Sequence, residues 1–286
     1  MKDTLRKRIR KTVAVISSSL LAVSLLAGLS GCQKQEPAPK PETELVKITV
    51  GASVTPHAEI LANLKEDMAA EGFDLTIIEY TDYVKPNLDT EAGDTDANFF
   101  QHLPYLLEFN ASQNTDLVSV VAVHFEPLGI YAGKTASIAD LAEGATIAVP
   151  NDTTNEARAL QLLAANGLIT LPVGSGLDVT PLDIIDNPLK LQFVELEAAA
   201  VPRQLDEVDL GVINGNNALA AGLDPTTVLA KEDPNSTAAT TYANILVVKA
   251  GNENNPGILA LIELLNSDKT REFINTNYPG AVIPVF

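Results

Sequence analysis

The sequence predicts an α/β protein built as two lobes. Segments of strand character alternate with amphipathic helical segments, first over residues 45–130 and again from residue 146 onward. Apolar residues make up 46% of the 286-residue chain, which is enough to fill the core of one large domain or of two medium ones. Strand-like segments near 125–132 and 242–249 would carry the chain out of the first lobe and back into it. A single domain is the alternative.

The N-terminal segment has the pattern of an export signal. A basic stretch, an apolar run over 13–26 and a group of small residues follow in order and end in Leu29-Ser30-Gly31-Cys32. The apolar run is shorter than the roughly 20 residues that a membrane-spanning helix needs. The pattern resembles the bacterial lipobox, which implies a lipoprotein signal peptide over 1–31 and a diacylated Cys32 as the mature N-terminus. Cys32 is the only cysteine, so no intrachain disulfide is expected.

Residues 32–44 are predicted to form a disordered tether, because they contain several prolines and almost no apolar side chains. The whole sequence carries a net charge of −18, which argues against nucleic acid as a partner. A surface this acidic would not bind an anionic lipid bilayer by itself. The acyl chains on Cys32 would therefore have to provide the membrane attachment.

The first lobe is expected to begin with a parallel strand–helix–strand unit. Its strands are predicted at 45–50 and 73–79, and the helix between them ends at Gly72. The apolar face of that helix is made by Ala58, Ile60, Leu61, Leu64 and Met68. Later strands are predicted at 117–123, 128–132, 146–149, 191–196, 210–213 and 242–248. The predicted lobe limits are 45–130 with 242–286 for the first lobe and 131–241 for the second.

Aromatic side chains gather at one point of the predicted first lobe. Residues 97–99 predict a buried strand, and Pro104 suits the first turn of a helix over 105–110. Phe100 and His102 would then lie in the strand-to-helix loop, which is where open α/β sheets bind ligands. Phe99 is expected in the core, whereas a histidine between aromatic residues in a loop favours a binding role.

Arg158 is a candidate for binding an anion. It lies near the start of a predicted helix over 156–166, where a cation opposes the helix dipole unless an anion is close by. Its guanidinium can hold a carboxylate through two parallel hydrogen bonds. The alternative is a surface arginine paired with Glu156 or Asp152.

Two asparagines are candidates for the opposite end of a ligand. Asn214 closes the predicted strand 210–213, and Asn244 lies inside the apolar run 242–248, where a buried amide needs partners. Their carbonyl oxygens could accept from an ammonium group. An arginine for a carboxylate, two amides for an ammonium and aromatic rings for a side chain together indicate a receptor for a free amino acid.

Enzyme and metal functions have weaker support in the sequence. It contains no nucleophile elbow, no phosphate-binding loop, no dinucleotide fingerprint and no His-Glu-x-x-His motif. The three histidines, His57, His102 and His124, could in principle bind a divalent metal together with acidic residues. A surface adhesin and a hydrolase are further alternatives.

Six short runs resemble the NlpA family of methionine-binding lipoproteins, which are the solute receptors of methionine ABC importers. The runs begin at Thr55, Asp82, Asp96, Val149, Glu195 and Val212, and read TPHAEIL, DYVKPN, DANFFQH, VPND, ELEA and VIN. They follow family order, and the likeness extends from about residue 46 to the end of the chain. It implies a two-lobed, periplasmic-binding-protein-like α/β fold with a ligand cleft between the lobes and two crossover segments.

The resemblance also implies the ligand-binding residues. Tyr83, Phe100, His102 and Tyr105 would surround the thioether, Arg158 would bind the carboxylate, and Asn214 and Asn244 would bind the amino group. The expected function is capture of L-methionine for an ABC importer permease and its ATPase, at the bacterial cell envelope, without catalysis or cofactor. The sequence leaves open D-methionine, methionine sulfoxide or a methionine peptide as the ligand, and a metal-binding importer receptor as the function. The run after Asn214, Gly-Asn-Asn, is unusually small and polar, so fine specificity is open too.

Overall fold

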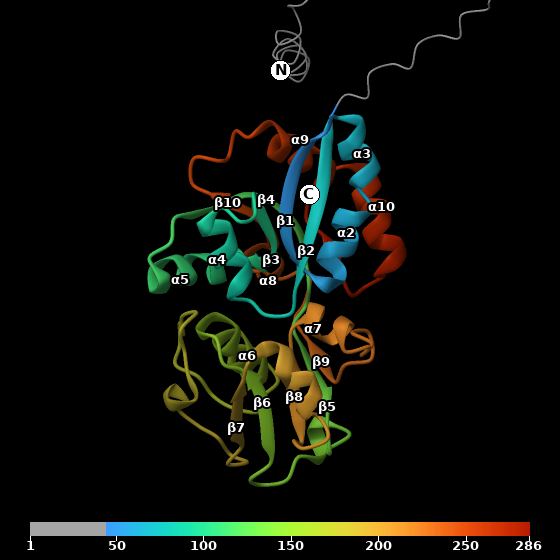
Figure 1. Cartoon of the computed structure of the whole chain (residues 1–286). Helices are drawn as coiled ribbons and strands as arrows, with labels where there is room; N and C mark the ends of the chain where they lie inside the picture. Colours follow the sequence, from blue (N-terminus) through green and yellow to red (C-terminus); the bar gives the residue numbers. More distant parts are fainter. Residues whose placement is uncertain (1–43) are drawn as a thin grey trace, which may run out of the picture. The chain divides into compact units, whose positions relative to one another are not determined.

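The computed structural model describes residues 44–286, and their strands form two separate sheets (Figure 1). We call the six-stranded sheet with its helices lobe 1 and the five-stranded sheet with its helices lobe 2. Both lobes belong to one unit, Leu45–Phe286. The expected signal peptide, Cys32 and nearly all of the expected tether fall outside the described residues. Within residues 44–286, no helix has the length and apolar character needed to cross a bilayer.

The sheet of lobe 1 combines both ends of the described chain. Its strand order is β11-β4-β10-β3-β1-β2. The predicted parallel pair of β1 and β2 is confirmed, while β10 returns from late in the sequence and runs antiparallel between β3 and β4. The strands are β1 (Val46–Ser53), β2 (Phe73–Tyr80), β3 (Ala97–His102), β4 (Leu117–Phe125), β10 (Asn244–Lys249) and β11 (Ile283–Pro284).

The apolar face predicted after the first strand is confirmed, but the helix that carries it is interrupted. All five predicted face residues, Ala58 to Met68, are buried in the main core of lobe 1. They lie on η2 (Val54–Ala58), α2 (Glu59–Ala62) and α3 (Lys65–Ala70), except Leu64, which lies at the break between α2 and α3. Thr55, with φ −138° and ψ 143°, is extended and precedes the residues of this face. The other helices of lobe 1 are α4 (Lys85–Ala92), α5 (Leu103–Gln113), α9 (Pro256–Leu265) and α10 (Asp268–Asn277).

The prediction that Phe100 and His102 lie in a loop is wrong, because β3 continues through both residues to His102. The extension is stabilised by β10, in which Asn244 pairs with His102 and Ile245 with Gln101. Helix α5 then begins at once, with Pro104 in its first turn as predicted. The aromatic stretch therefore lies on the last residues of a strand and the first turn of the next helix.

Lobe 2 has the strand order β7-β6-β8-β5-β9. Strand β5 begins at Gly129, so residues 129–130, which the sequence placed in the first lobe, pair in the sheet of lobe 2. The chain passes between the two sheets at 126–128 and at 232–243, and the second passage contains α8 (Ala238–Thr241). The remaining elements are β5 (Gly129–Ala132), β6 (Thr146–Pro150), β7 (Gln192–Leu196), β8 (Leu210–Ile213), β9 (Ala230–Lys231), α6 (Thr153–Ala165) and α7 (Gly215–Ala220).

A substitution at Phe99 tests whether the core of lobe 1 is packed as described. Its ring is fully buried and packs edge-on against His57 and His124, at centroid distances of 4.7 Å and 5.4 Å. Phe99→Ala should lower the free energy of unfolding by about 3–5 kcal/mol, because it leaves a cavity. The control Leu107→Ala removes a side chain that is 59% exposed and should change it by no more than about 0.5 kcal/mol. Denaturant titration measures both, and equal effects would contradict the packing described.

Candidate ligand-binding site

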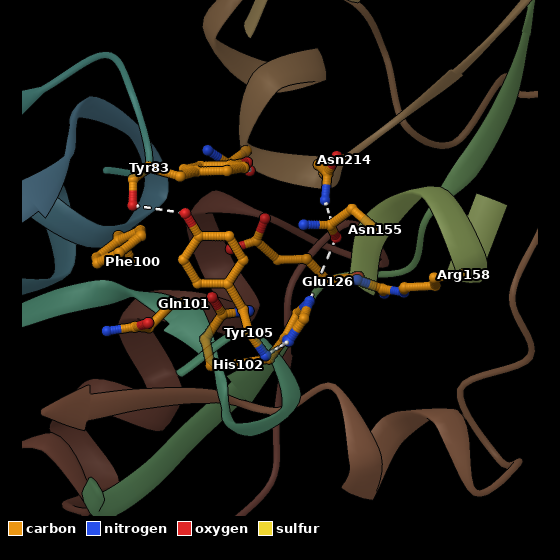
Figure 2. Close-up of a pocket in the computed structure, with 12 residues that line it drawn as sticks. Tyr83, Phe100, Gln101, His102, Tyr105, Glu126, Asn155, Arg158 and Asn214 are labelled. Carbon is orange, nitrogen blue, oxygen red and sulfur yellow. Dashed lines mark hydrogen bonds between the residues drawn. The ribbon is translucent and has the colours of Figure 1, made fainter. Parts of the chain in front are cut away.

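The seven residues expected to bind a ligand all line one pocket: Tyr83, Phe100, His102, Tyr105, Arg158, Asn214 and Asn244. Both lobes contribute, since β3 and α5 belong to lobe 1 and α6 and α7 to lobe 2. Figure 2 shows the aromatic rings at one end of the pocket and Arg158 at the other. The cavity volume is about 20 Å³, which is room for about one water molecule. The two lobes therefore leave too little space in this pocket for an amino acid.

Three aromatic rings form the apolar end of the pocket. The rings of Tyr83, Phe100 and Tyr105 lie 5.8–6.0 Å apart between centroids, and Tyr105 is edge-on to the other two. The Tyr105 hydroxyl donates to the backbone carbonyl of Tyr83 at 2.9 Å. The Tyr83 hydroxyl donates to Asn216 Oδ1 at 2.6 Å and accepts from Asn217 Nδ2 at 3.0 Å, which links lobe 1 to α7. Tyr83 thus belongs to both the aromatic group and the contact between lobes.

His102 connects lobe 1 to the polar side of the pocket. Its Nδ1 accepts from the backbone N–H of Tyr105 at 3.2 Å, so Nε2 carries the proton and donates to Asn155 Oδ1 at 3.2 Å. Burial and the positive charge of Arg158 lower the pKa of His102 to about 3, so the ring is neutral at pH 7. Asn155 Oδ1 also accepts from Asn214 Nδ2 at 2.8 Å. Asn214 Oδ1 is buried and has no hydrogen-bond partner among the described residues.

Arg158 is held at the border between the lobes by an unexpected partner. It is 4% exposed and pairs with Glu232, through Nε at 2.7 Å and Nη2 at 2.5 Å, rather than with Glu156 or Asp152. Nη2 also donates to the backbone carbonyl of Glu126 at 2.9 Å. Burial alone would lower the pKa of Arg158, but the adjacent Glu232 carboxylate raises it. Nη1 makes no hydrogen bond to residues 44–286 in this arrangement and remains available.

A buried carboxylate that the sequence analysis did not assign also lines the pocket. Glu126 is 4% exposed, and its Oε1 lies 2.7 Å from His124 Nε2 and 3.5 Å from His57 Nε2. His57 Nε2 is also 3.0 Å from Asn244 Oδ1, which leaves that oxygen one further lone pair. Burial lowers the pKa of His57 to about 4 and that of His124 to about 3, so both rings are neutral at pH 7.

This His57–His124–Glu126 cluster offers three possible metal-ligand atoms within 4.8 Å of one another, but His102 is not part of it. A metal-bound histidine ordinarily donates its other ring N–H to a partner. The Nδ1 atoms of His57 and His124 are buried without partners in the described part of the chain. With the proton on Nε2 instead, both rings can donate to the oxygens of Glu126 and Asn244. The surroundings therefore favour a hydrogen-bonded carboxylate over a metal centre.

Sequence reasoning missed Glu126 and Asn155 as pocket residues. Glu126 directly follows β4, and a carboxylate after a fully buried strand end was a usable signal. Asn155 lies one turn before Arg158 on α6, so both could have been assigned to the same face. Glu232 gave no such signal, because it lies in a polar segment far from Arg158 in sequence.

Helix α6 begins in an acidic environment. Its N-cap Asp152 accepts from the backbone N–H of Asn155 at 3.0 Å, and Glu156 follows in the first turn. Glu156 is 7% exposed, and its Oε1 has no partner in the described range 44–286. Burial, with repulsion from Glu195 and Asp152, raises the pKa of Glu156 to about 7. Glu156 does not line the pocket.

This fold and site define a class of protein: a two-lobed solute-binding protein that encloses its ligand between α/β lobes. The chain belongs to the NlpA lipoprotein family, whose sequence profile matches residues 48–286. It is 40% identical to the methionine-binding lipoprotein MetQ of Bacillus subtilis, over 84% of this chain and 88% of that protein.

Solved structures agree with this assignment. The lipoprotein Tp32 of Treponema pallidum is 42% identical, with a TM-score of 0.79 over 84% of this chain and 99% of that one. A nutrient-binding protein from Burkholderia cenocepacia, solved with methionine bound, is 40% identical, with a TM-score of 0.79 over 84% and 100% of the two chains. The family, the fold class and the type of protein expected from the sequence are confirmed.

Because of Glu156, the free energy of unfolding should depend on pH in a way that can be measured. Its folded-state pKa of about 7 lies above the ordinary value of 4.5, so ionisation of Glu156 destabilises the fold progressively between pH 4.5 and 7, and the full loss persists above pH 7. Glu156→Gln should raise the free energy of unfolding by about 1–3 kcal/mol at pH 8 and much less at pH 5. Denaturant titrations at both pH values measure this, and a gain that is equal at both would contradict the assigned cause.

Proposed function

We propose that this protein is a membrane-tethered receptor that captures L-methionine and delivers it to the permease and ATPase of an ABC importer. The observation that carries the proposal is the arrangement of the pocket. Aromatic rings gather at one end, Arg158 stands at the other, and the unpaired Oδ1 of Asn214 lies in the pocket wall. A zwitterion with an apolar side chain needs these three kinds of contact. The methionine-binding function of the relatives supports the same ligand.

Arg158 would bind the ligand carboxylate through the part of its guanidinium that the protein leaves free. Glu232 occupies the Nε–Nη2 edge, and the Glu126 carbonyl accepts from Nη2. The carboxylate would therefore bind at Nη1, and Glu232 would fix the plane in which Nη1 is presented. The amino group would lie against the oxygen of Asn214, with Asn244 as a second acceptor.

The side chain of methionine would lie among Tyr83, Phe100, His102 and Tyr105. Sulfur contacts with aromatic rings contribute about 0.3–1.5 kcal/mol each, and they distinguish a thioether from an aliphatic chain. Because the closed cavity of about 20 Å³ is too small for an amino acid, the lobes must separate to admit one. Closure around the ligand would then report occupancy to the permease. D-methionine and methionine sulfoxide are the alternative ligands.

Attachment to the membrane would be provided by Cys32. The lipobox-like run before it, together with membership in a lipoprotein family, supports cleavage before Cys32 and acylation of its sulfur. The proline-containing segment that follows would then act as a tether at the cell envelope.

Removal of Arg158 should weaken methionine binding by two to four orders of magnitude, because a buried carboxylate would lose its cation at a cost of about 3–5 kcal/mol. Arg158→Lys should recover only part of this loss, since an ammonium cannot reproduce guanidinium geometry. The exposed Arg203 of lobe 2 does not line the pocket, and Arg203→Ala is the matched control. Titration calorimetry measures all three variants.

The double variant Arg158→Ala/Glu232→Ala separates binding from stability, because it removes both members of the ion pair and leaves no buried charge without a partner. It should fold and still bind methionine poorly. Affinity close to wild type in a folded Arg158→Ala protein would show that the carboxylate is bound elsewhere, and would overturn the proposed ligand orientation.

Cys32→Ala should yield an unacylated protein that retains ligand binding, because Cys32 precedes the folded unit. Metabolic labelling with a radioactive fatty acid, followed by cell fractionation, measures this. The wild type should be labelled and found in the membrane fraction. An unlabelled wild type would refute the lipid anchor without affecting the proposed ligand.

A further inference from the structure

Glu126 has a position that the proposed ligand contacts leave unexplained. It lies in the first passage between the lobes, is 4% exposed, and lines the pocket between the aromatic end and Arg158 (Figure 2). Its Oε1 is 2.7 Å from His124 Nε2 and 3.5 Å from His57 Nε2, and the backbone N–H of Asn216 donates to the same carboxylate. His124 of lobe 1 and the backbone of Asn216 in lobe 2 therefore hold Glu126 in place by hydrogen bonds from both lobes.

None of these donors supplies a positive charge at pH 7. His57 and His124 have pKa values of about 4 and about 3 because both are buried, so both rings are neutral. Within residues 44–286, no lysine or arginine forms a salt bridge with the Glu126 carboxylate, and the nearby Arg158 is paired with Glu232. A buried carboxylate without a cation is costly, and burial accordingly raises the pKa of Glu126.

The chain also leaves room for Glu126. Gly215 lies against it, and a Cβ atom at that position would stand 2.8 Å from Glu126 Cβ and 3.0 Å from its Oε2. Any larger residue at 215 would have to move the carboxylate. The small residue after Asn214 is therefore explained by close packing against Glu126.

We propose that Glu126 binds the ammonium group of the ligand and thereby restricts the receptor to free α-amino acids. This inference rests on the proposed function, because Arg158 would hold the carboxylate at the same time. A peptide that ends in methionine would place a neutral amide N–H against Glu126. A peptide that begins with methionine would have no carboxylate at Arg158. The buried charges of Glu126 and Arg158 would thus favour a free amino acid over a peptide as the ligand.

Ligand binding should then be linked to a proton on Glu126. The titratable or charged groups that interact with it are His57 from η2, His124 from β4, Arg158 from α6, Tyr83 from the turn before α4, Tyr131 from β5 and Tyr278 after α10. Between pH 5 and 7 the two histidines are neutral, and the tyrosines and Arg158 keep their protons. Glu126 is the member of this group whose proton an arriving ammonium would displace. The ammonium stabilises the carboxylate form, so affinity should rise with pH as Glu126 ionises.

The test is titration calorimetry on the full chain with L-methionine, N-acetyl-L-methionine and glycyl-L-methionine. The wild type should bind methionine at least about 100-fold more tightly than either N-blocked ligand. Glu126→Gln keeps the size of the side chain and should lower methionine affinity by about 100-fold, while the weak affinity for N-acetyl-L-methionine changes by less than about threefold. The control Glu156→Gln removes a buried carboxylate outside the pocket and should preserve the wild-type preference.

A purely structural role of Glu126 would weaken the binding of all three ligands alike, and that result would overturn the proposal. Methionine affinity within about threefold of wild type in Glu126→Gln would overturn it as well. If the wild type itself binds no methionine, the proposed receptor function is wrong. If the wild type binds methionine but Glu126→Gln binds it equally well, only the proposed role of Glu126 is wrong.

A second measurement needs no variant. Burial raises the pKa of Glu126, so the share of this carboxyl that is protonated at pH 5 is larger than for an exposed glutamate. Calorimetry of wild-type protein and methionine at this pH, in two buffers of different ionisation enthalpy, should show net proton release on binding. Absence of proton release would overturn the proposal even if Glu126→Gln does not fold.

Discussion

The buried ion pair between Arg158 and Glu232 is the interaction on which the arrangement of the site depends. A guanidinium that is 4% exposed cannot remain charged without a partner, and Glu232 provides one from the second passage between the lobes. Glu232 Oε2 also accepts from the backbone N–H of Leu128, and Arg158 donates to the carbonyl of Glu126, both on the first passage. One pair of charges therefore fixes helix α6 to both segments that connect the lobes.

Apart from this ion pair, most polar groups that line the pocket are uncharged. All three histidines of the chain are buried with strongly lowered pKa values, so they serve as neutral hydrogen-bond donors and acceptors at pH 7. The asparagines add dipoles without charge. A zwitterionic ligand would therefore meet a positive Arg158, a negative Glu126 and an apolar group of rings. In the proposed binding mode, this charge pattern would select for both ends of a free amino acid more strongly than for any one side chain.

The sequence predicted those parts of the structure that depend on local pattern. The apolar face from Ala58 to Met68 and the helix start at Pro104 follow from residue spacing alone. Residue patterns made Phe100, His102, Arg158, Asn214 and Asn244 candidates for the pocket, and the family resemblance added Tyr83 and Tyr105. The structure brings all seven together. Local pattern failed at Phe100 and His102, because their strand conformation depends on β10, which comes from much later in the chain. Local pattern also could not identify the partner of Arg158. Glu232 is 74 residues away in the sequence, and nothing in the residues around either side chain indicates the pairing.

The orientation of the ligand between two buried charges is the central claim, and a crystal structure of the protein with L-methionine tests it most directly. The account predicts the carboxylate on Arg158 Nη1, the ammonium against Glu126 and Asn214, and the thioether among Tyr83, Phe100 and Tyr105. Methionine bound in the reverse orientation, with its carboxylate among the rings or its ammonium away from Glu126, would contradict it. Methionine bound outside this cleft would contradict the proposed function as a whole.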